Sequence, residues 1–333
     1  MGKDTFQMKI SVIVPIYGVE RFIGRCVESL MQQTMQEDVE YIFVDDTTPD
    51  RSMDVLQEVL ERYPARKAQT VLLRHETNQG LPAARNTGLA VAGGEYVFHC
   101  DSDDFVEPDM LDTLYHTAIS QRADYVWCDW FLSFEKSERY MRQPACASAD
   151  SALRTMLCGG LKYNVWNKLV RRQLYVDNGI LFPAGYGMGE DMTMIRLLAC
   201  AQKVAYVHRA LYHYVRLNTH AFTSTFSVRQ LEDVAYNAQK TIDFVIAKKQ
   251  NKQELELACF KLNIKYPLII GDDVSQYRLW RSWFQEANRY IGKNPMGGIR
   301  SRVLQYAARY KCDLILKLHY WLVYKVVYGI IYR

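Results

Sequence analysis

Two spacings of apolar residues alternate through residues 9–128, and this alternation limits the possible fold more than any other feature. Short apolar runs typical of strands cover residues 9–15, 40–45, 70–75, 95–100 and 124–128. Between them, apolar residues recur every three or four positions in segments 20–33, 51–62, 82–91 and 108–121, which predicts helices. Strands that alternate with helices indicate an α/β fold, here a Rossmann-like, mostly parallel sheet flanked by helices.

Polar or turn-forming residues follow three of the predicted strands. Pro15 and Tyr17 stand at the end of the first strand, Asp45 and Asp46 at the end of the second, and residues 101–104 at the end of the fourth. Ligands of open parallel sheets bind beyond the carboxyl ends of the strands. We therefore expect a single binding site at this edge of the sheet.

The segment 101–104 reads Asp-Ser-Asp-Asp, and its carboxylates repel one another. A divalent cation would stabilise them and would also neutralise the charge on a leaving nucleotide diphosphate. The alternative is a solvated acidic turn that caps the helix near Pro108. Asp45 and Asp46 leave a similar choice open, because acidic strand ends also occur in phosphoacceptor domains.

The formal charge of +4 is concentrated at the C-terminal end of the chain. Residues 300–333 hold seven Lys and Arg against one Asp, so the remainder carries 4 − 6 = −2. A nucleic-acid-binding protein spreads basic residues over its working face, whereas a basic, aromatic end suits an anionic membrane surface. This distribution argues against nucleic acid as a partner.

Eight cysteines without a C-x-x-C pair or a zinc-like spacing fit a reducing compartment. The apolar run at residues 10–16 is too short for a secretory signal. We therefore expect a cytoplasmic protein that can associate with the inner face of the cell membrane.

Helical periodicity dominates the chain from about residue 227, with predicted helices at 227–249, 254–266, 275–291 and 300–310. Residues 134–151 are polar and aperiodic, which predicts a linker. We expect one domain at residues 1–225 and a helical C-terminal region at 226–333. Its end, residues 313–333, places tyrosines four residues apart among apolar residues and predicts an interfacial membrane helix. Packing on the protein's own core or in a homodimer is the alternative.

Four segments in the first third of the chain resemble, in order and spacing, the motifs of the family 2 glycosyltransferases. They are SVIVPIY at residues 11–17 with Glu20, VDDTTPD at 44–50, NQGLPAARNTG at 78–88 and FHCDSDD at 98–104. The second departs from the family pattern, because Thr47 and Thr48 replace its usual Gly-Ser pair. The resemblance implies a GT-A-type fold with a nucleotide-sugar half at about residues 9–130 and an acceptor half at about 150–225.

The resemblance also implies which residues bind the nucleotide of a UDP-sugar. Pro15, Tyr17 and Glu20 would line the base and ribose pocket. Asp46 and Asn78 would contact the uracil edge. Simpler alternatives exist, since Tyr17 can pack against its neighbours and Asn78 can form the turn that follows it.

A second group of residues is implied for the phosphates and the metal. Arg85 would approach the nucleotide, and Asp101 with Ser102 would contact ribose or phosphate. Asp103 would bind Mn²⁺ or Mg²⁺ together with Asp101, and His213 is a candidate third ligand. For Arg85, an ion pair with Asp101 or Asp103 is the alternative role.

Glu190 and Asp191 follow a glycine-rich loop and precede an apolar-faced helix. A carboxylate at a helix N-terminus stabilises the helix by about 0.3–1 kcal/mol, so plain capping is one explanation. The family, however, places its catalytic base at a Glu-Asp pair after a Trp-Asn-Lys-Leu-like segment, which matches residues 166–169. The resemblance implies Asp191 as general base with Glu190 beside it, and Trp166 and Lys168 near the acceptor. A core position is the alternative for Trp166.

These features predict an inverting glycosyltransferase that moves a hexosyl or N-acetylhexosaminyl group from a UDP-sugar to a glycan or a polyprenyl-diphosphate-linked acceptor. The alternative from another class is a non-catalytic nucleotide-sugar-binding subunit of a membrane assembly complex, which would not need Asp191. A phosphoacceptor domain that uses Asp45 or Asp46 is disfavoured by the second acidic cluster and by the length of the chain.

Overall fold

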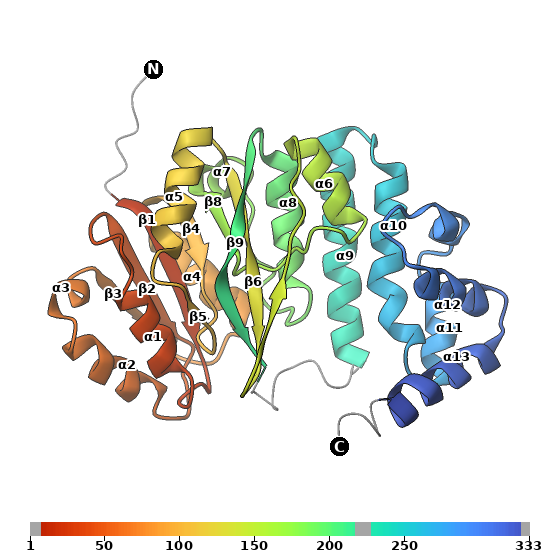
Figure 1. The fold of residues 1–333 in the computed structure, drawn as a ribbon, viewed down its shortest axis with the longest axis horizontal. Helices are drawn as coiled ribbons and strands as arrows, with labels where there is room; N and C mark the ends of the chain where they lie inside the picture. The colour runs from red at the N-terminus through yellow and green to blue at the C-terminus, as the bar shows by residue number, and fades with distance from the viewer. Residues whose placement is uncertain (1–7, 217–227, 328–333) are drawn as a thin grey trace. The chain divides into compact units, whose positions relative to one another are not determined.

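A computed structural model describes residues 8–216 and 228–327 of the chain, and its first half forms the predicted parallel sheet (Figure 1). The strands are β1 (Met8–Ile16), β2 (Val39–Asp45), β3 (Thr70–Arg74) and β4 (Gly94–His99), in the spatial order β3-β2-β1-β4. Each neighbouring pair is parallel. β1 is buried along most of its length, as expected for a strand covered on both faces.

The helices that connect these strands lie close to their predicted positions. They are α1 (Ile23–Met31), α2 (Ser52–Glu61), the short α3 (Pro64–Lys67), α4 (Leu81–Val91) and α5 (Met110–Gln121). α4 packs closely on β1 at Gly88, where an added Cβ would lie 2.5 Å from the Cγ2 of Ile13. Only glycine permits this approach, which holds α4 and the loop before it at the carboxyl end of β3.

The sheet continues beyond β4 with strands that follow β4 in the sequence. These are β5 (Phe105–Val106), β6 (Tyr125–Ser133), β7 (Glu138–Met141), β8 (Lys168–Arg171) and β9 (Val204–Val215). The order after β4 is β8-β6-β9-β5, and β7 pairs with β6. β8 is antiparallel to β4 and to β6, β6 and β9 are parallel, and β5 is antiparallel to β9. The sheet as a whole is mixed, and the expectation of a mostly parallel sheet holds for β1 to β4.

Residues 134–151, predicted as a linker, contain β7 and the start of α6 (Ala149–Leu157). Four backbone pairings between β6 and β7, from Trp130 with Met141 to Ser133 with Glu138, make this segment a hairpin. α7 (Arg172–Asp177), the 3₁₀ turn η1 (Glu190–Met192), α8 (Thr193–Cys200) and α9 (Val228–Lys249) complete the elements of this part of the chain.

The chain forms two compact units that are interleaved in sequence. The first comprises Met1–Ala152 and Tyr163–Thr241, and the second comprises Leu153–Lys162 and Ile242–Arg333. The expected boundary at residue 225 lies outside the described residues, and the observed division falls within α9. Across residues 8–216 and 228–327, we find no helix with the length and apolar character needed to cross a membrane.

The second unit is helical, as predicted, but the single helix predicted for residues 275–291 is wrong. The unit contains α10 (Glu254–Lys265), η2 (Tyr266–Ile269), α11 (Val274–Ser282), η3 (Gln285–Lys293), α12 (Ile299–Arg309), α13 (Asp313–Tyr320) and the π-helical η4 (Trp321–Val327). The break lies at Phe284, whose φ of 44° is left-handed. Lys265 is fully buried there, and its Nζ donates to the carbonyl oxygen of Trp283 at 2.8 Å. This ammonium satisfies helix-end carbonyls, which stabilises the break.

Candidate active site

Strand β9 holds the acidic turn at residues 101–104 in place. Asp104 is buried and accepts hydrogen bonds from the Tyr212 hydroxyl and from the Val215 backbone N–H, each at 2.7 Å. The Tyr212 hydroxyl also accepts from the Asp101 backbone N–H at 3.2 Å. Burial, followed by the charges of Asp103 and Asp101, raises the pKa of Asp104 well above its usual range. Asp104 therefore anchors the turn, and the carboxylates of Asp101 and Asp103 beside it are only partly buried.

Arg85 of α4 contacts the turn through an ion pair with Asp101. The distance from Arg85 Nη2 to Asp101 Oδ1 is 2.9 Å, and the side chains are 1% and 23% exposed respectively. The Nε and Nη1 atoms of Arg85 are buried and have no hydrogen-bond partner within the described part of the chain. Buried donors without a protein partner mark positions for water or for a ligand.

Glu190 and Asp191 lie in η1, directly after Gly189, whose φ of 86° favours glycine. Burial raises the pKa of Glu190 to about 8, and the charge of Asp191 adds to this increase. Burial also raises the pKa of Asp191 to about 6, whereas the positive charges of Arg85 and Lys168 lower it. Asp191 Oδ1 accepts a hydrogen bond from the Val165 backbone N–H at 3.2 Å. This carboxylate can therefore exchange a proton near neutral pH.

Helix α9 fixes the loop that carries this carboxylate pair. The Gly187 backbone N–H donates to Asp233 Oδ2 at 2.8 Å, and Asn237 Nδ2 donates to the Met188 carbonyl oxygen at 2.7 Å. The rings of Tyr186 and Tyr236 stack with their centroids 3.8 Å apart. The position of Glu190 and Asp191 thus depends on side chains that follow them by about 45 residues.

The two residues expected at the acceptor are both buried. Lys168 is 1% exposed, and its Nζ donates to the Asn164 carbonyl oxygen at 2.6 Å and to Asn167 Oδ1 at 2.7 Å. Burial lowers the pKa of Lys168 to about 7, and the charge of Asp191 opposes this change. Trp166 stacks on Tyr212 with ring centroids 4.5 Å apart. Lys168 thus acts on Asp191 from within the protein, and Trp166 packs in the core behind the acidic turn.

His213 lies on the opposite side of β9 from Tyr212, because neighbouring residues of a strand point to opposite faces. Its Nε2 is 2.7 Å from Glu107 Oε1, and its Nδ1 is 2.8 Å from Glu138 Oε1. Its ring stacks on Phe105 with centroids 4.0 Å apart. These contacts fasten β5 and β7 to β9, and they give no support to His213 as a third metal ligand.

The chemistry of the site fits a divalent cation that is shared with a ligand. Repulsion between carboxylates contributes to the raised pKa values of Asp104, Glu190 and Asp191. In the described ranges, no three His, Cys, Asp or Glu side chains are grouped so that they alone hold a metal. Magnesium-type ions are commonly bound by one or two carboxylates plus phosphate oxygens and water. Asp101 and Asp103 fit this role once a diphosphate supplies the remaining oxygens.

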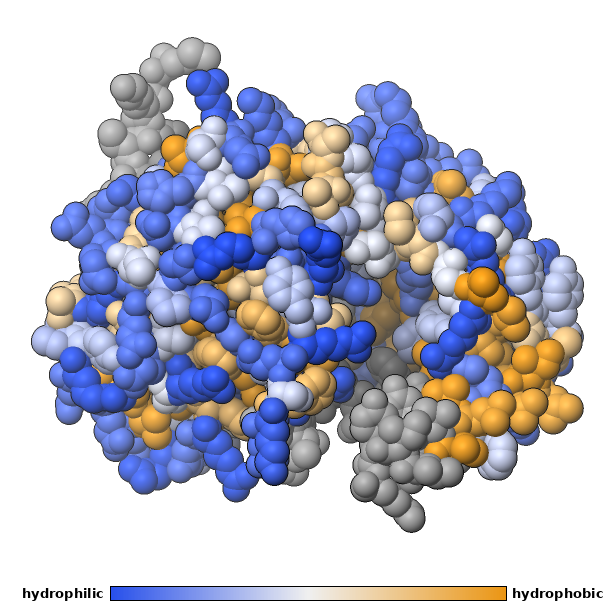
Figure 2. Space-filling model, in the orientation of Figure 1, coloured by the Kyte–Doolittle hydropathy of each residue, from blue (hydrophilic) through white to orange (hydrophobic). Residues whose placement is uncertain are grey.

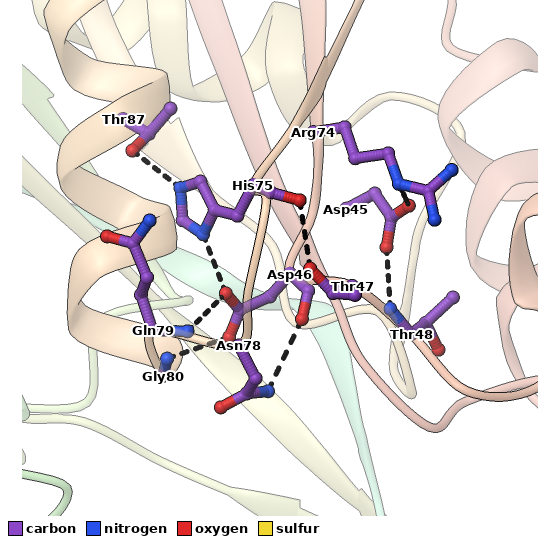
Figure 3. A network of polar contacts seen from close by, with 10 residues as sticks. All are labelled: Asp45, Asp46, Thr47, Thr48, Arg74, His75, Asn78, Gln79, Gly80 and Thr87. Atoms are coloured by element: carbon purple, nitrogen blue, oxygen red, sulfur yellow. Dashed lines mark hydrogen bonds and ion pairs between the residues drawn. The ribbon is translucent and has the colours of Figure 1, made fainter.

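The predicted nucleotide residues Asp46 and Asn78 lie together at the ends of β2 and β3 (Figure 3). The Asp46 carboxylate is buried and accepts from the backbone N–H groups of Gln79 and Gly80, each at 2.8 Å. His75 Nδ1 lies 2.6 Å from Asp46 Oδ1, and Asn78 Nδ2 donates to the Asp46 carbonyl oxygen at 3.3 Å. Asp46 therefore shapes the loop before α4 and thereby sets the position of Asn78.

The loop after β1 joins this edge of the sheet. Pro15 is buried beside Val44 of β2, whereas Tyr17 is 51% exposed. The exposed Glu20 accepts from the Arg51 backbone N–H at 3.2 Å and donates its own backbone N–H to Asp50 at 2.9 Å. The ends of β1 and β2 are thus tied together, with the Tyr17 ring open to solvent.

Several residues that shape the site were missing from the sequence prediction. Asp104 belongs to the predicted acidic turn but had no role of its own, and Tyr212 stands next to the predicted His213. Strand alternation indicates that only one of residues 212 and 213 faces the turn, without showing which. His75 ends a predicted strand, which is the same signal that pointed to Asp45 and Asp46. Asp233 carries no local signal, because its contact with the loop before Glu190 arises only in the folded chain.

Comparison with known proteins places this arrangement among the glycosyltransferases. "Uncharacterized glycosyltransferase EpsJ" of Bacillus subtilis is 34% identical over 224 residues, which are 64% of this chain and 62% of that protein. The chain therefore spans about three fifths of the length of EpsJ.

Solved structures share the fold at low sequence identity. S. aureus TarS 1-349 in complex with UDP-GlcNAc aligns with a TM-score of 0.63 and 20% identity, covering 96% of this chain and 92% of that chain. Mannosyltransferase PcManGT from Pyrobaculum calidifontis, in complex with GDP-Man and Mn²⁺, aligns with a TM-score of 0.53 and 15% identity, covering 93% and 88%. The predicted GT-A-type fold with a helical C-terminal region is confirmed. The sequence model described as "Glycosyl transferase family 2" matches residues 11–188, more than half of the chain, which therefore belongs to this family.

Proposed function

We propose that the chain transfers a hexosyl or N-acetylhexosaminyl group from a UDP-sugar to a hydroxyl group, with inversion at the anomeric carbon. The observation that best supports this proposal is the arrangement around Arg85. This buried guanidinium pairs with Asp101 of the acidic turn and also favours the ionised form of Asp191. The group that would bind the donor and the group that would accept a proton thus interact with the same positive charge.

Donor binding is assigned to the edge formed by the first four strands. Tyr17 and Asn78 would contact the base, with Pro15, Glu20 and Asp46 shaping the pocket around it. UDP is favoured by the motif resemblance and by the UDP-GlcNAc complex of the TarS neighbour.

The diphosphate is assigned to the acidic turn. Asp101 and Asp103 would hold Mn²⁺ or Mg²⁺ against the diphosphate, with buried Ser102 between them. Bound there, the cation would neutralise the charge that builds on the leaving UDP.

Sugar transfer requires that the acceptor hydroxyl loses a proton as its oxygen attacks the anomeric carbon. Asp191 would take this proton while the bond between the sugar and the diphosphate breaks and UDP leaves. Burial and the charge of Asp191 raise the pKa of Glu190, which favours its protonated form and would limit the negative charge beside Asp191. Lys168 and Arg85 would keep Asp191 ionised by their positive charges.

The acceptor is proposed to be a glycan or a polyprenyl-diphosphate-linked saccharide at the cytoplasmic face of the membrane. The eight cysteines are free thiols, which agrees with a reducing compartment. The basic charge near the C-terminus would bring the protein to a surface that displays such an acceptor.

Release of UDP from a panel of nucleotide sugars with Mn²⁺ tests this function. We expect one or a few UDP-sugars to be hydrolysed slowly without an acceptor and faster with one. The non-catalytic binding subunit predicts saturable binding of a nucleotide sugar, measured by calorimetry, without release of UDP at any acceptor concentration. That result would replace the enzymatic proposal.

The pH dependence of kcat/KM tests the role of Asp191 separately. The ionised carboxylate is the active form, so activity is expected to persist at higher pH and to fall about tenfold per unit below pH ~6. In Lys168→Met the same decline is expected at higher pH, because loss of a positive charge raises the pKa of Asp191. A profile that is flat from about pH 5 to about pH 8 in both proteins would contradict the assignment.

A further inference from the structure

Helix α13 and the following η4 expose an apolar face that the second unit does not use for its own core. Its residues recur at helical intervals along one side of the helix: Leu314, Ile315, Leu318, Trp321 and Leu322. Leu314 is 79% exposed and Leu318 is 53% exposed, whereas Leu316 on the opposite side is fully buried. Leu316 therefore makes the contact of α13 with the core, and the apolar residues on the outer face can contact a binding partner.

Helix α12 repeats the arrangement. The exposed apolar residues of α12 and of its C-cap are spaced by four, three and four positions: Ile299, Val303, Tyr306 and Tyr310. Its opposite side buries Leu304, Ala307 and Ala308. Figure 2 shows hydrophobic side chains gathered over these last helices, at the lower right. An exposed apolar area of this kind marks an interaction site rather than ordinary protein surface.

Positive charge surrounds the two apolar faces. Between residues 299 and 322 the chain contains five Arg and Lys, namely Arg300, Arg302, Arg309, Lys311 and Lys317, and one acidic residue, Asp313. Asp313 pairs with Arg281 of α11, so its charge is compensated within the unit. Lys311 and Lys317 are exposed, one just before α13 and one within it. The surface that results is apolar with a cationic border.

An apolar surface with a cationic border favours an anionic lipid surface, rather than a second copy of the chain, as the binding partner. A symmetric dimer through this face would bring the same positive charges together, which opposes association. Anionic lipid headgroups attract those charges, while the leucines and Trp321 enter the boundary between headgroups and acyl chains. Because no helix in the described ranges is suited to crossing a bilayer, the helices would lie in its surface.

We infer that the exposed face of α12, α13 and η4 is a docking surface for anionic lipid. Leu314, Leu318 and Trp321 insert, Tyr310 lies at headgroup level, and Lys311 and Lys317 contact the lipid phosphates. This inference is independent of the reaction proposed above, because none of these residues belongs to the candidate active site.

Sedimentation of the full-length chain with vesicles tests the inference. Vesicles of phosphatidylcholine with about 30% phosphatidylglycerol are compared with phosphatidylcholine alone. We expect binding to the anionic vesicles that weakens as salt is raised, and at least about tenfold weaker binding for Leu314→Asp/Leu318→Asp. Lys311→Gln/Lys317→Gln is expected to weaken binding to anionic vesicles about tenfold.

The matched control is Val176→Asp/Ile119→Asp, which adds the same two charges at exposed apolar positions of the first unit and should bind as the unaltered chain does. Donor binding and thermal unfolding report whether each variant is folded. If the Leu314→Asp/Leu318→Asp variant is unfolded, the Lys311→Gln/Lys317→Gln variant and the salt dependence decide the question.

Equal binding to both kinds of vesicle, or no binding, would overturn the inference. A concentration-dependent dimer that the leucine variant dissociates, without vesicle binding, would assign the face to a second copy.

Discussion

Replacement of Asp191 by Asn is expected to lower kcat by about 10²- to 10⁴-fold, because the amide cannot take the proton of the acceptor hydroxyl. Asn retains the shape of the side chain and can still accept the hydrogen bond from the Val165 backbone N–H. The KM for the donor should therefore change little. The measurement is the steady-state rate of UDP release with acceptor present, together with calorimetric binding of UDP.

The control for this variant is Asp177→Asn, an exposed carboxylate on α7 in the same unit. It should retain full activity and the same thermal unfolding temperature. Full activity of Asp191→Asn, in a protein that binds UDP normally, would show that another group accepts the proton. The hydrogen bond from the Val165 backbone N–H would then remain as the structural role of Asp191.

Replacement of Asp103 by Asn is expected to lower kcat/KM by about 10³-fold, equivalent to ~4 kcal/mol, because the site loses a charged oxygen ligand. Asp103 is partly exposed, in contrast to the buried Asp104, so the fold should survive the change. The sharper measurement is the affinity for UDP with and without Mn²⁺. We expect Mn²⁺ to strengthen UDP binding in the unaltered chain and to have little effect in the variant.

Asp112→Asn provides the control, since this carboxylate lies on α5 and pairs only with His116 among the ion pairs of the described residues. Its UDP affinity should respond to Mn²⁺ as in the unaltered chain. An Mn²⁺-dependent gain in UDP affinity that is the same in Asp103→Asn and in the unaltered chain would show that the metal binds without Asp103, and would remove this residue from the proposed metal site.

The parallel half of the fold was predictable because its signals are local. Each of the strands β1 to β4 is a short apolar run, and each following helix has an apolar face of regular period. Motif spacing then placed Asp46, Asn78, Arg85 and Asp101 at one edge of the sheet. The structure brings Asp46 next to Asn78 and Arg85 next to Asp101.

The mixed half of the sheet was less predictable because its pairings are distant in sequence. β8 is four residues long and pairs with β4, which precedes it by about 70 residues. Strand pairing of this kind is decided by tertiary packing more than by local propensity. The same reason explains the broken helix at Phe284, where the buried Lys265 from another helix stabilises the break.

The sequence also did not show on which face of a strand a given side chain lies. His213 and Tyr212 are neighbours and both have rings with polar atoms, yet only Tyr212 is hydrogen-bonded to the acidic turn. Which of two adjacent strand residues faces a site depends on register, and a shift of one position exchanges them.

The attachment of the loop before Glu190 to α9 limits where this protein can be divided. A fragment that ends at residue 225 would keep every strand of the sheet and every motif residue, yet it would lack Asp233, Tyr236 and Asn237. The loop before Glu190 would lose its supports and much of its order. The first part of α9, up to Thr241, thus belongs to the first unit, although the sequence assigns it to the C-terminal region, and a fragment that is to keep this loop in place must retain it.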